Sequence, residues 1–176
     1  MEQPAGNKIT GNPSSHPVLS VKWVEDFPDI PLNRNEAYKL RVTSKGVEIE
    51  AITETGVYRA IQTLRQLTEK KGNGIAITGC EITDWPAFRI RGFMQDVGRT
   101  YISTDELKRE IAILARYKIN VFHWHLTENQ AWRLQSKVFP MLNDSVNTTR
   151  QPGKYYTLEE ARELAAFCKQ HHVLLI

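Results

Sequence analysis

A strand, a helix and a second strand follow one another within residues 90–133, and this order constrains the fold of the chain more than any other feature. Residues 90–97 mix apolar and β-branched side chains and stop at Gly98, which predicts a buried strand. Residues 119–127 are again apolar and aromatic, which predicts a second strand. The segment between them is long enough for a crossover, so the two strands are expected to pair in parallel as a βαβ unit.

The expected helix of this unit has a clear start. Ser103 and Glu106 form an S-x-x-E capping box, in which each side chain satisfies a free backbone N–H group at the first turn. One face then carries apolar residues at helical spacing, namely Leu107, Ile111 and Leu114. The pattern stops near Lys118.

Polar side chains follow each predicted strand of the unit. In parallel α/β folds, ligands bind at the carboxyl ends of strands, so these residues are candidates for a functional site. They are Asp96, Arg99, His123, His125, Glu128, Asn129, Trp132 and Arg133. For any one of them a structural role is at least as common, because most buried polar groups are simply hydrogen-bonded.

The two runs RGFMQDVGRTY and NVFHWHLTENQAWRL together resemble a known family. The pattern RG-x-M-x-D-V-x-R-x-Y/F, a helix, and then H-x-H-L-x-[DE]-[DN]-Q-x-W-R is similar to the first two barrel strands of the family 20 glycoside hydrolases, the β-N-acetylhexosaminidases. The resemblance is strong over residues 80–176 and weak before them. It implies that residues 87–176 are the N-terminal part of a (β/α)8 TIM barrel.

The resemblance also implies roles for two residues. The arginine at the position of Arg99 binds hydroxyls of the non-reducing-end sugar, a role suited to a planar guanidinium with several fixed donors. The acid at the position of Glu128 has a supporting role toward a histidine further along the chain, near the catalytic acid. Many members have two aspartates where this chain has Glu128 and Asn129.

The implied reaction removes terminal N-acetylglucosamine or N-acetylgalactosamine from glycans with retention, using the acetamido group of the substrate as nucleophile. An Asp-Glu pair on a later strand, beyond Ile176, would stabilise the intermediate and act as general acid. The resemblance implies no metal and no cofactor. It implies a periplasmic, secreted or lysosomal location, which the sequence itself does not specify.

Residues 18–86 predict a small α+β domain that precedes the barrel and consists of an antiparallel sheet with a helix on one face. Strands are expected at residues 18–24, at 38–43 and 47–51 as an antiparallel hairpin, and at 75–77. A helix is expected over about residues 54–69, with Gly72 placed to end it. Residues 1–17 are rich in Pro, Gly, Asn and Ser, which favours a flexible lead-in.

The chain is expected to be truncated. After a long loop at 129–156, Thr157 and Glu160 repeat the capping box, and the following helix has an apolar side made of Leu158, Ala161, Leu164, Ala165 and Cys168. A third strand begins at 173–176, whereas a closed barrel needs eight such units. We therefore expect the 176-residue chain alone to be inactive and to self-associate through open strand faces.

The aromatic residues of the long loop have two interpretations. Trp132, Phe139, Tyr155 and Tyr156 can stack on sugar rings, but aromatic side chains more often pin a loop to the core, and pinning is favoured.

Charge and composition exclude several classes of partner. The net charge of +3 is dispersed among residues of both signs, so a nucleic-acid partner is not expected. No apolar run approaches the roughly 20 residues of a membrane-spanning helix, and the first residues lack the pattern of a signal peptide. Cys80 and Cys168 are far apart in sequence and are expected to be free thiols.

Two other functional classes fit parts of the pattern. His123 and His125 lie two apart on a strand and so face the same side, a spacing also used by metal-dependent barrel hydrolases. A non-catalytic carbohydrate-binding module is a third possibility, but it fits less well because the polar residues gather at strand ends and not on a flat face.

Overall fold

The computed structural model describes residues 8–9 and 18–176. The chain divides between Arg89 and Ile90 into two compact units, called here the N-terminal unit and the C-terminal unit. Most of the predicted lead-in at residues 1–17 lies outside the described residues, but Lys8–Ile9 within it forms strand β1.

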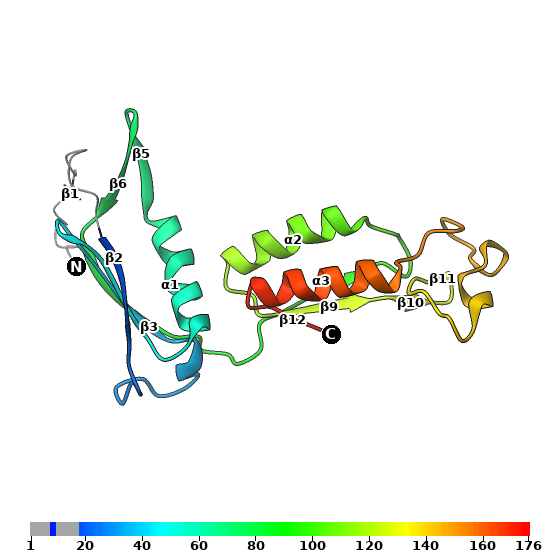
Figure 1. Cartoon of the computed structure of the whole chain (residues 1–176), viewed down its shortest axis with the longest axis horizontal. Coiled ribbons are helices and arrows are strands. Elements are labelled where there is room, and N and C mark those ends of the chain that lie inside the picture. The colour runs from blue at the N-terminus through cyan, green and yellow to red at the C-terminus, as the bar shows by residue number, and fades with distance from the viewer. Residues whose placement is uncertain (1–7, 10–17) are drawn as a thin grey trace. The chain divides into compact units, whose positions relative to one another are not determined.

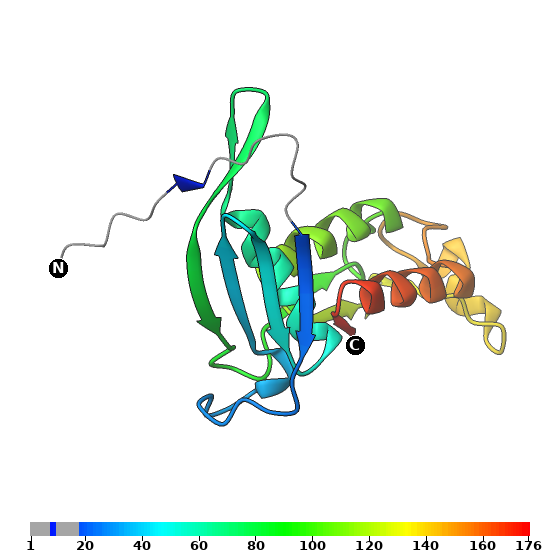
Figure 2. The ribbon, with the colours of Figure 1, turned by 60° about the vertical axis from the view of Figure 1, so that its left-hand side comes forward.

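A four-stranded sheet forms the body of the N-terminal unit (Figure 2). Its strand order is β2-β4-β3-β7, with β2 at Val18–Trp23, β3 at Tyr38–Thr43, β4 at Gly46–Ala51 and β7 at Cys80–Asp84. The predicted hairpin of β3 and β4 is confirmed. The prediction of a wholly antiparallel sheet is wrong, because β2 pairs with β4 in parallel. Strand β7 was not predicted from the sequence.

Helix α1 at Glu54–Gln66 packs against β3 and β4 on one face of this sheet. The apolar core lies between them and contains Tyr38, Leu40, Val42, Ile49, Ala51 and Ala60. The helix ends earlier than predicted, because Thr68–Lys71 leaves it to form β5, which pairs with β6 at Gly74–Thr78. Gly72 therefore does not end the helix. It has a φ of 58° in the turn of the β5–β6 hairpin, a conformation that glycine adopts without strain. Strand β1 pairs with β6 on the other side.

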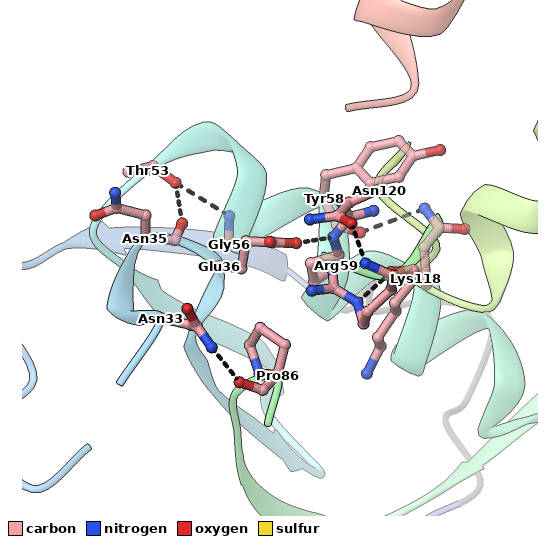
Figure 3. A network of polar contacts seen from close by, with 12 residues as sticks. Asn33, Asn35, Glu36, Thr53, Gly56, Tyr58, Arg59, Pro86, Lys118 and Asn120 are labelled. Atoms are coloured by element: carbon pink, nitrogen blue, oxygen red, sulfur yellow. Dashed lines mark hydrogen bonds and ion pairs between the residues drawn. The ribbon is translucent and has the colours of Figure 1, made fainter. Parts of the chain in front are cut away.

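Polar contacts connect the start of α1 to the short 3-10 helix η1 at Arg34–Glu36 (Figure 3). Thr53 caps α1 by accepting a hydrogen bond from Gly56 N at 3.3 Å, and its hydroxyl also donates to the carbonyl of Asn35. Glu36 pairs with Arg59 at 2.8 Å. Asn33, next to η1, donates to the carbonyl of Pro86 at 2.7 Å.

The C-terminal unit contains a parallel sheet with the order β8-β9-β12 (Figure 1). Its strands are β8 at Gly92–Asp96, β9 at Val121–His125 and β12 at Leu174–Leu175, connected by α2 at Thr104–Arg116 and α3 at Leu158–Gln170. The predicted parallel pairing and both predicted capping boxes are confirmed.

The two helices lie next to each other on one face of the parallel sheet (Figure 1). Phe122 and Trp124 of β9 are buried on the helix side. The alternation of side chains places Met94, Leu174 and Ile176 on the opposite face, where all three are exposed. The predicted apolar side of α3 is partly wrong, because Leu164 and Cys168 are buried whereas Ala165 is exposed.

The long loop at 129–156 has its own structure. Its first residues form a hairpin, in which β11 at Ala131–Trp132 pairs with β10 at Thr127–Glu128 just before the loop. The loop continues through two 3-10 helices, η2 at Pro140–Asn143 and η3 at Ser145–Asn147. Tyr156 ends the loop. Its ring lies 4.6 Å from that of Trp124 and 4.8 Å from that of Tyr101, so the pinning interpretation fits Tyr156. It does not fit Phe139, which is 61% exposed.

Cys80 and Cys168 are both free thiols, as predicted. Burial raises the pKa of Cys168 to about 11 and also raises the pKa of Cys80. Both thiols are therefore poor nucleophiles at neutral pH. Among the described residues, no helix is both long and apolar enough to cross a membrane.

Candidate functional site

Four of the predicted polar residues meet at the carboxyl end of the parallel sheet. Asp96 ends β8 and His125 ends β9, and the parallel register makes them direct partners. Glu128 lies on the β10–β11 hairpin that follows β9, and Arg99 lies on the loop after β8. Parallel strands end at the same edge of a sheet, which explains why residues separated in sequence come together here.

Arg99 is the central cation of this cluster. Its backbone N–H donates to Oδ1 of Asp96 at 3.0 Å, and its Nε donates to Oδ2 of the same carboxylate. Its Nη2 lies 4.0 Å from Oε1 of Glu128. The side chain of Arg99 is 55% exposed, so its guanidinium can still reach a ligand. The arrangement therefore presents a planar, oriented set of N–H donors toward solvent.

Arg99 also changes the protonation of Asp96. Desolvation raises the pKa of Asp96, but the two hydrogen bonds from Arg99 and its positive charge together lower it by more. The pKa of Asp96 is consequently below the usual aspartate range, and the carboxylate stays ionised at neutral pH.

Glu128 connects Arg99 to His125. Its Oε1 lies 3.1 Å from Nε2 of His125, and the ring of His123 lies 5.9 Å from that of His125. Gly98 allows Glu128 to approach, because a Cβ at position 98 would lie 3.0 Å from both the backbone N and the Cβ of Glu128. From the sequence, Gly98 was predicted only to end a strand.

The remaining predicted residues do not join the cluster in the same way. Asn129 and Trp132 are exposed, and Trp132 pairs with Thr127 on the other side of the hairpin from Glu128. Arg133 is fully buried, and its guanidinium donates to backbone carbonyls. Its partners lie on segments distant in sequence, so nothing in the sequence alone indicates that this cation is enclosed.

The arrangement does not favour the metal-dependent alternative. Within the described part of the chain, the only group of three possible ligands with atoms within 4.8 Å of one another is Asp96, His125 and Glu128, without His123. Arg99 already binds Asp96 and lies close to Glu128. A guanidinium in this position supplies the positive charge that a metal ion would bring, and it would repel the ion.

A shallow depression on the N-terminal unit is a weaker candidate site. It lies on the solvent face of the four-stranded sheet and is lined by residues including Lys39, Arg41, Glu48 and Glu81. Arg41 pairs there with Glu81 at 2.9 Å and lies 3.9 Å from Glu48. Charges that pair across neighbouring strands in this way stabilise a solvated sheet face and require no ligand.

Models of known families match this chain in two segments that meet close to the boundary between its two units. The model of the glycosyl hydrolase family 20 catalytic domain matches residues 88–176, and that of glycosyl hydrolase family 20, domain 2, matches residues 5–85. A β-hexosaminidase of Porphyromonas gingivalis is 38% identical over 99% of this chain and 22% of its own length. A β-N-acetylhexosaminidase of Cellulomonas fimi is 35% identical over 84% of this chain and 30% of its own length.

Solved structures agree with these matches. The exo-β-N-acetylglucosaminidase of Vibrio harveyi in complex with N-acetylglucosamine has a TM-score of 0.77 and 32% identity, over 89% of this chain and 26% of that one. The β-N-acetylhexosaminidase of Bacteroides fragilis has a TM-score of 0.78 and 30% identity, over 93% of this chain and 33% of that one. The chain thus spans between about a fifth and a third of the length of these relatives. An α+β region followed by the first strands of a barrel, matched by both domain models, shows that the chain belongs to glycosyl hydrolase family 20.

Proposed function

We propose that this chain is part of a β-N-acetylhexosaminidase that removes terminal non-reducing N-acetylhexosamine residues from glycans with retention of configuration. The observation that carries the proposal is the Asp96–Arg99–Glu128–His125 cluster at the carboxyl end of the sheet of a family 20 chain. The Vibrio harveyi relative was crystallised with N-acetylglucosamine, which supports a sugar of this class as the ligand.

Arg99 is the substrate-binding residue in this proposal. Asp96 fixes the guanidinium by accepting from both its Nε and the backbone N–H of Arg99. The terminal N–H groups are then oriented to donate to two neighbouring hydroxyls of a sugar ring. Since the exposed side chain is already held by Asp96, little further rotamer entropy is lost when the sugar binds.

Glu128 supports the site without taking part in bond breaking. It lies between Arg99 and His125, 4.0 Å from Nη2 of the first and 3.1 Å from Nε2 of the second. Through these two contacts the β10–β11 hairpin is fixed relative to the loop that carries Arg99. We assign no general acid to residues 90–176, because in the proposed substrate-assisted reaction that role belongs to an Asp-Glu pair on a later strand of the barrel.

Substitution of Arg99 in the full-length enzyme tests the proposal. Arg99→Ala removes charge-assisted hydrogen bonds of about 1.5 to 3 kcal/mol each, so loss of two bonds should lower kcat/KM for an aryl N-acetyl-β-glucosaminide by roughly 10²- to 10⁴-fold. Arg99→Lys should restore only part of the activity, because an ammonium does not reproduce the planar fork. Arg109→Ala, which removes an exposed arginine of α2, is the matched control. A loss of tenfold or less in Arg99→Ala would refute the assignment.

The substrate-assisted mechanism has its own test. An aryl β-glucoside lacks the acetamido group and should not be hydrolysed, and the first product released from the N-acetyl substrate should have the β configuration in an NMR time course. The 176-residue chain alone should show no turnover of either substrate. Turnover of the glucoside, or an α product, would exclude the mechanism.

A further inference from the structure

Arg133 is a fully buried cation whose hydrogen bonds go to the backbone. Its Nε donates to the carbonyl of Val97 at 3.0 Å, and its Nη2 donates to that of Arg150 at 2.8 Å. Its Nη1 donates to the carbonyls of Gln151 at 3.2 Å and Lys154 at 2.7 Å. Only a guanidinium offers enough donors in a fixed plane to bind four carbonyls at once.

These carbonyls belong to two separate segments. Val97 directly follows β8 and lies two residues before Arg99. The other three belong to a turn at residues 150–154, in which Gln151 has a φ of 51° and Gly153 a φ of 72°. Arg133 therefore connects the loop that carries Arg99 to a turn whose shape is set by two residues in the left-handed region.

The turn at residues 150–154 makes a second contact with this loop, two residues after Arg99. The side-chain Oε1 of Gln151 accepts a hydrogen bond from the backbone N–H of Tyr101 at 2.5 Å. The ring of Tyr101 in turn stacks on Tyr156 at 4.8 Å. The segment is thus fixed at Val97 and at Tyr101, and Arg99 lies midway between the two points.

We propose that Arg133 is a positioning residue for Arg99: together with Gln151 it fixes the backbone from Val97 to Tyr101, so that the Arg99 guanidinium meets the sugar in a single orientation. The proposal rests on the proposed function of Arg99. Arg133 itself is enclosed and does not touch substrate. Its contribution passes through the backbone of the loop, because a displacement of about 1 Å at a binding group is enough to reduce the rate strongly.

A purely structural role for Arg133 predicts a different pattern of kinetic effects. If its bonds only stabilise the fold, their loss lowers activity by the same factor whether Arg99 is present or absent. If Arg133 acts through Arg99, its loss has no further effect once Arg99 has been replaced. A double-mutant cycle between the two positions separates these cases.

The cycle uses the full-length enzyme with Arg133→Lys and Gln151→Ala, each made alone and combined with Arg99→Ala. Gln151→Ala removes one hydrogen bond from an exposed residue and should lower kcat/KM by about 2- to 12-fold, and Arg133→Lys, which loses several, should lower it by more than tenfold. In the Arg99→Ala background neither change should lower it further. Arg150→Ala is the matched control, because it removes an exposed side chain from the same turn and keeps the carbonyl that Arg133 binds.

Each outcome decides between the possibilities. Equal losses in both backgrounds would overturn the positioning role and leave the proposed function intact. A loss of tenfold or less in kcat/KM for Arg99→Ala would instead refute the substrate-binding role of Arg99 in the proposed function, and with it any need to position Arg99. If Arg133→Lys does not fold, the cycle with Gln151→Ala alone gives the answer, since an additive Gln151→Ala effect would also overturn the proposal.

Discussion

The two units of this chain cover their sheets to different extents. In the N-terminal unit, α1 packs on the apolar face of the sheet over β3 and β4, and charged side chains pair across the strands on the solvent face. Among the described strands of this sheet, only edge strand β2 exposes apolar side chains on the helix side. In the C-terminal unit, α2 and α3 cover one face of the parallel sheet, while Met94, Leu174 and Ile176 on the other face are 54 to 61% exposed. The functional candidates Asp96 and His125 lie on that same open face.

This difference separates stability from function within one chain. The N-terminal unit has a core of its own, and charged residues on the solvent face of its sheet pair with one another. The C-terminal unit places its polar residues where apolar packing is incomplete. An open face of a parallel sheet is a face that further structure is expected to cover, because such sheets are normally buried on both sides.

The strongest test of this comparison is to separate the units. Residues 18–89 expressed alone should be monomeric and unfold cooperatively, whereas residues 90–176 alone should self-associate through the open sheet face. Light scattering and calorimetry on each piece give the answer. Association of residues 18–89 would break the comparison, and the place to expect it is edge strand β2, where Leu19, Val21 and Trp23 are exposed.

Core substitution measures how far the N-terminal unit depends on its own packing. Ile49→Ala truncates a fully buried residue of β4 and should cost about 2 to 5 kcal/mol in the free energy of unfolding of residues 18–89. Ile75→Ala truncates an exposed residue of β6 in the same unit and should cost no more than about 0.5 kcal/mol. Urea denaturation of both variants checks the difference, and equal costs would mean that the cluster around Ile49 is not the core.

The sequence predicted those parts of the fold that depend on neighbours in sequence. Ser103 and Thr157 were identified as helix caps because both partners of a capping box lie within one turn. The end of α1 was placed too late because Thr68–Lys71 has no strong local preference, and its strand conformation depends on pairing with β6. The parallel direction of β2 likewise depends on its pairing with β4, a strand more than 20 residues away. Local periodicity carries no information about the direction of such a pairing.

In the candidate site, too, some features could be predicted from the sequence, and others depend on contacts between distant segments. Asp96, Arg99, His125 and Glu128 were predictable because parallel strands bring their carboxyl ends to one edge. The enclosed position of Arg133 was not predictable, since its partners at residues 150–154 reach it only through the fold of a long loop. The close approach of Gly98 to Glu128 depends equally on the path of the β10–β11 hairpin.

Two glycines, one in each unit, differ in how closely other atoms approach them. Gly98→Ala adds a Cβ within 3.0 Å of the backbone N of Glu128, so the hairpin must move, at a cost of about 1 to 3 kcal/mol. The displaced Glu128 should lower kcat/KM of the full-length enzyme. Gly74→Ala in β6 meets only the carbonyl of Lys71 at 3.7 Å and should leave kcat/KM unchanged. Equal activities of the two variants would show that the position of Glu128 is unimportant.

Removal of a helix cap should lower stability by a similar amount in the two units, and by less than truncation of the core residue Ile49. Thr53→Ala removes the cap of α1, and Ser103→Ala removes the capping box of α2. Each should cost about 0.5 to 2 kcal/mol, because one backbone donor of the first turn loses its partner. Urea denaturation measures the first in residues 18–89, and hydrogen exchange of the Glu106 amide measures the second in the full-length enzyme. Unchanged exchange at Glu106 would mean that water replaces Ser103 without loss.

The smallest expected effect concerns pH and is confined to the C-terminal unit. The pKa of Asp96 is lowered in the folded state. The stabilisation that its ionised carboxylate contributes is therefore complete above the ordinary aspartate pKa range and is lost as pH falls through the folded pKa. Protonated Asp96 no longer fixes Arg99, and KM of the full-length enzyme should rise at that acidic end. The rise should be modest because solvent screens a guanidinium that is more than half exposed. Asp96→Asn should raise KM at every pH and remove the acidic rise. A wild-type KM that rises instead near neutral pH, with the same rise in Asp96→Asn, would assign the titration to another group and separate Asp96 from the orientation of Arg99.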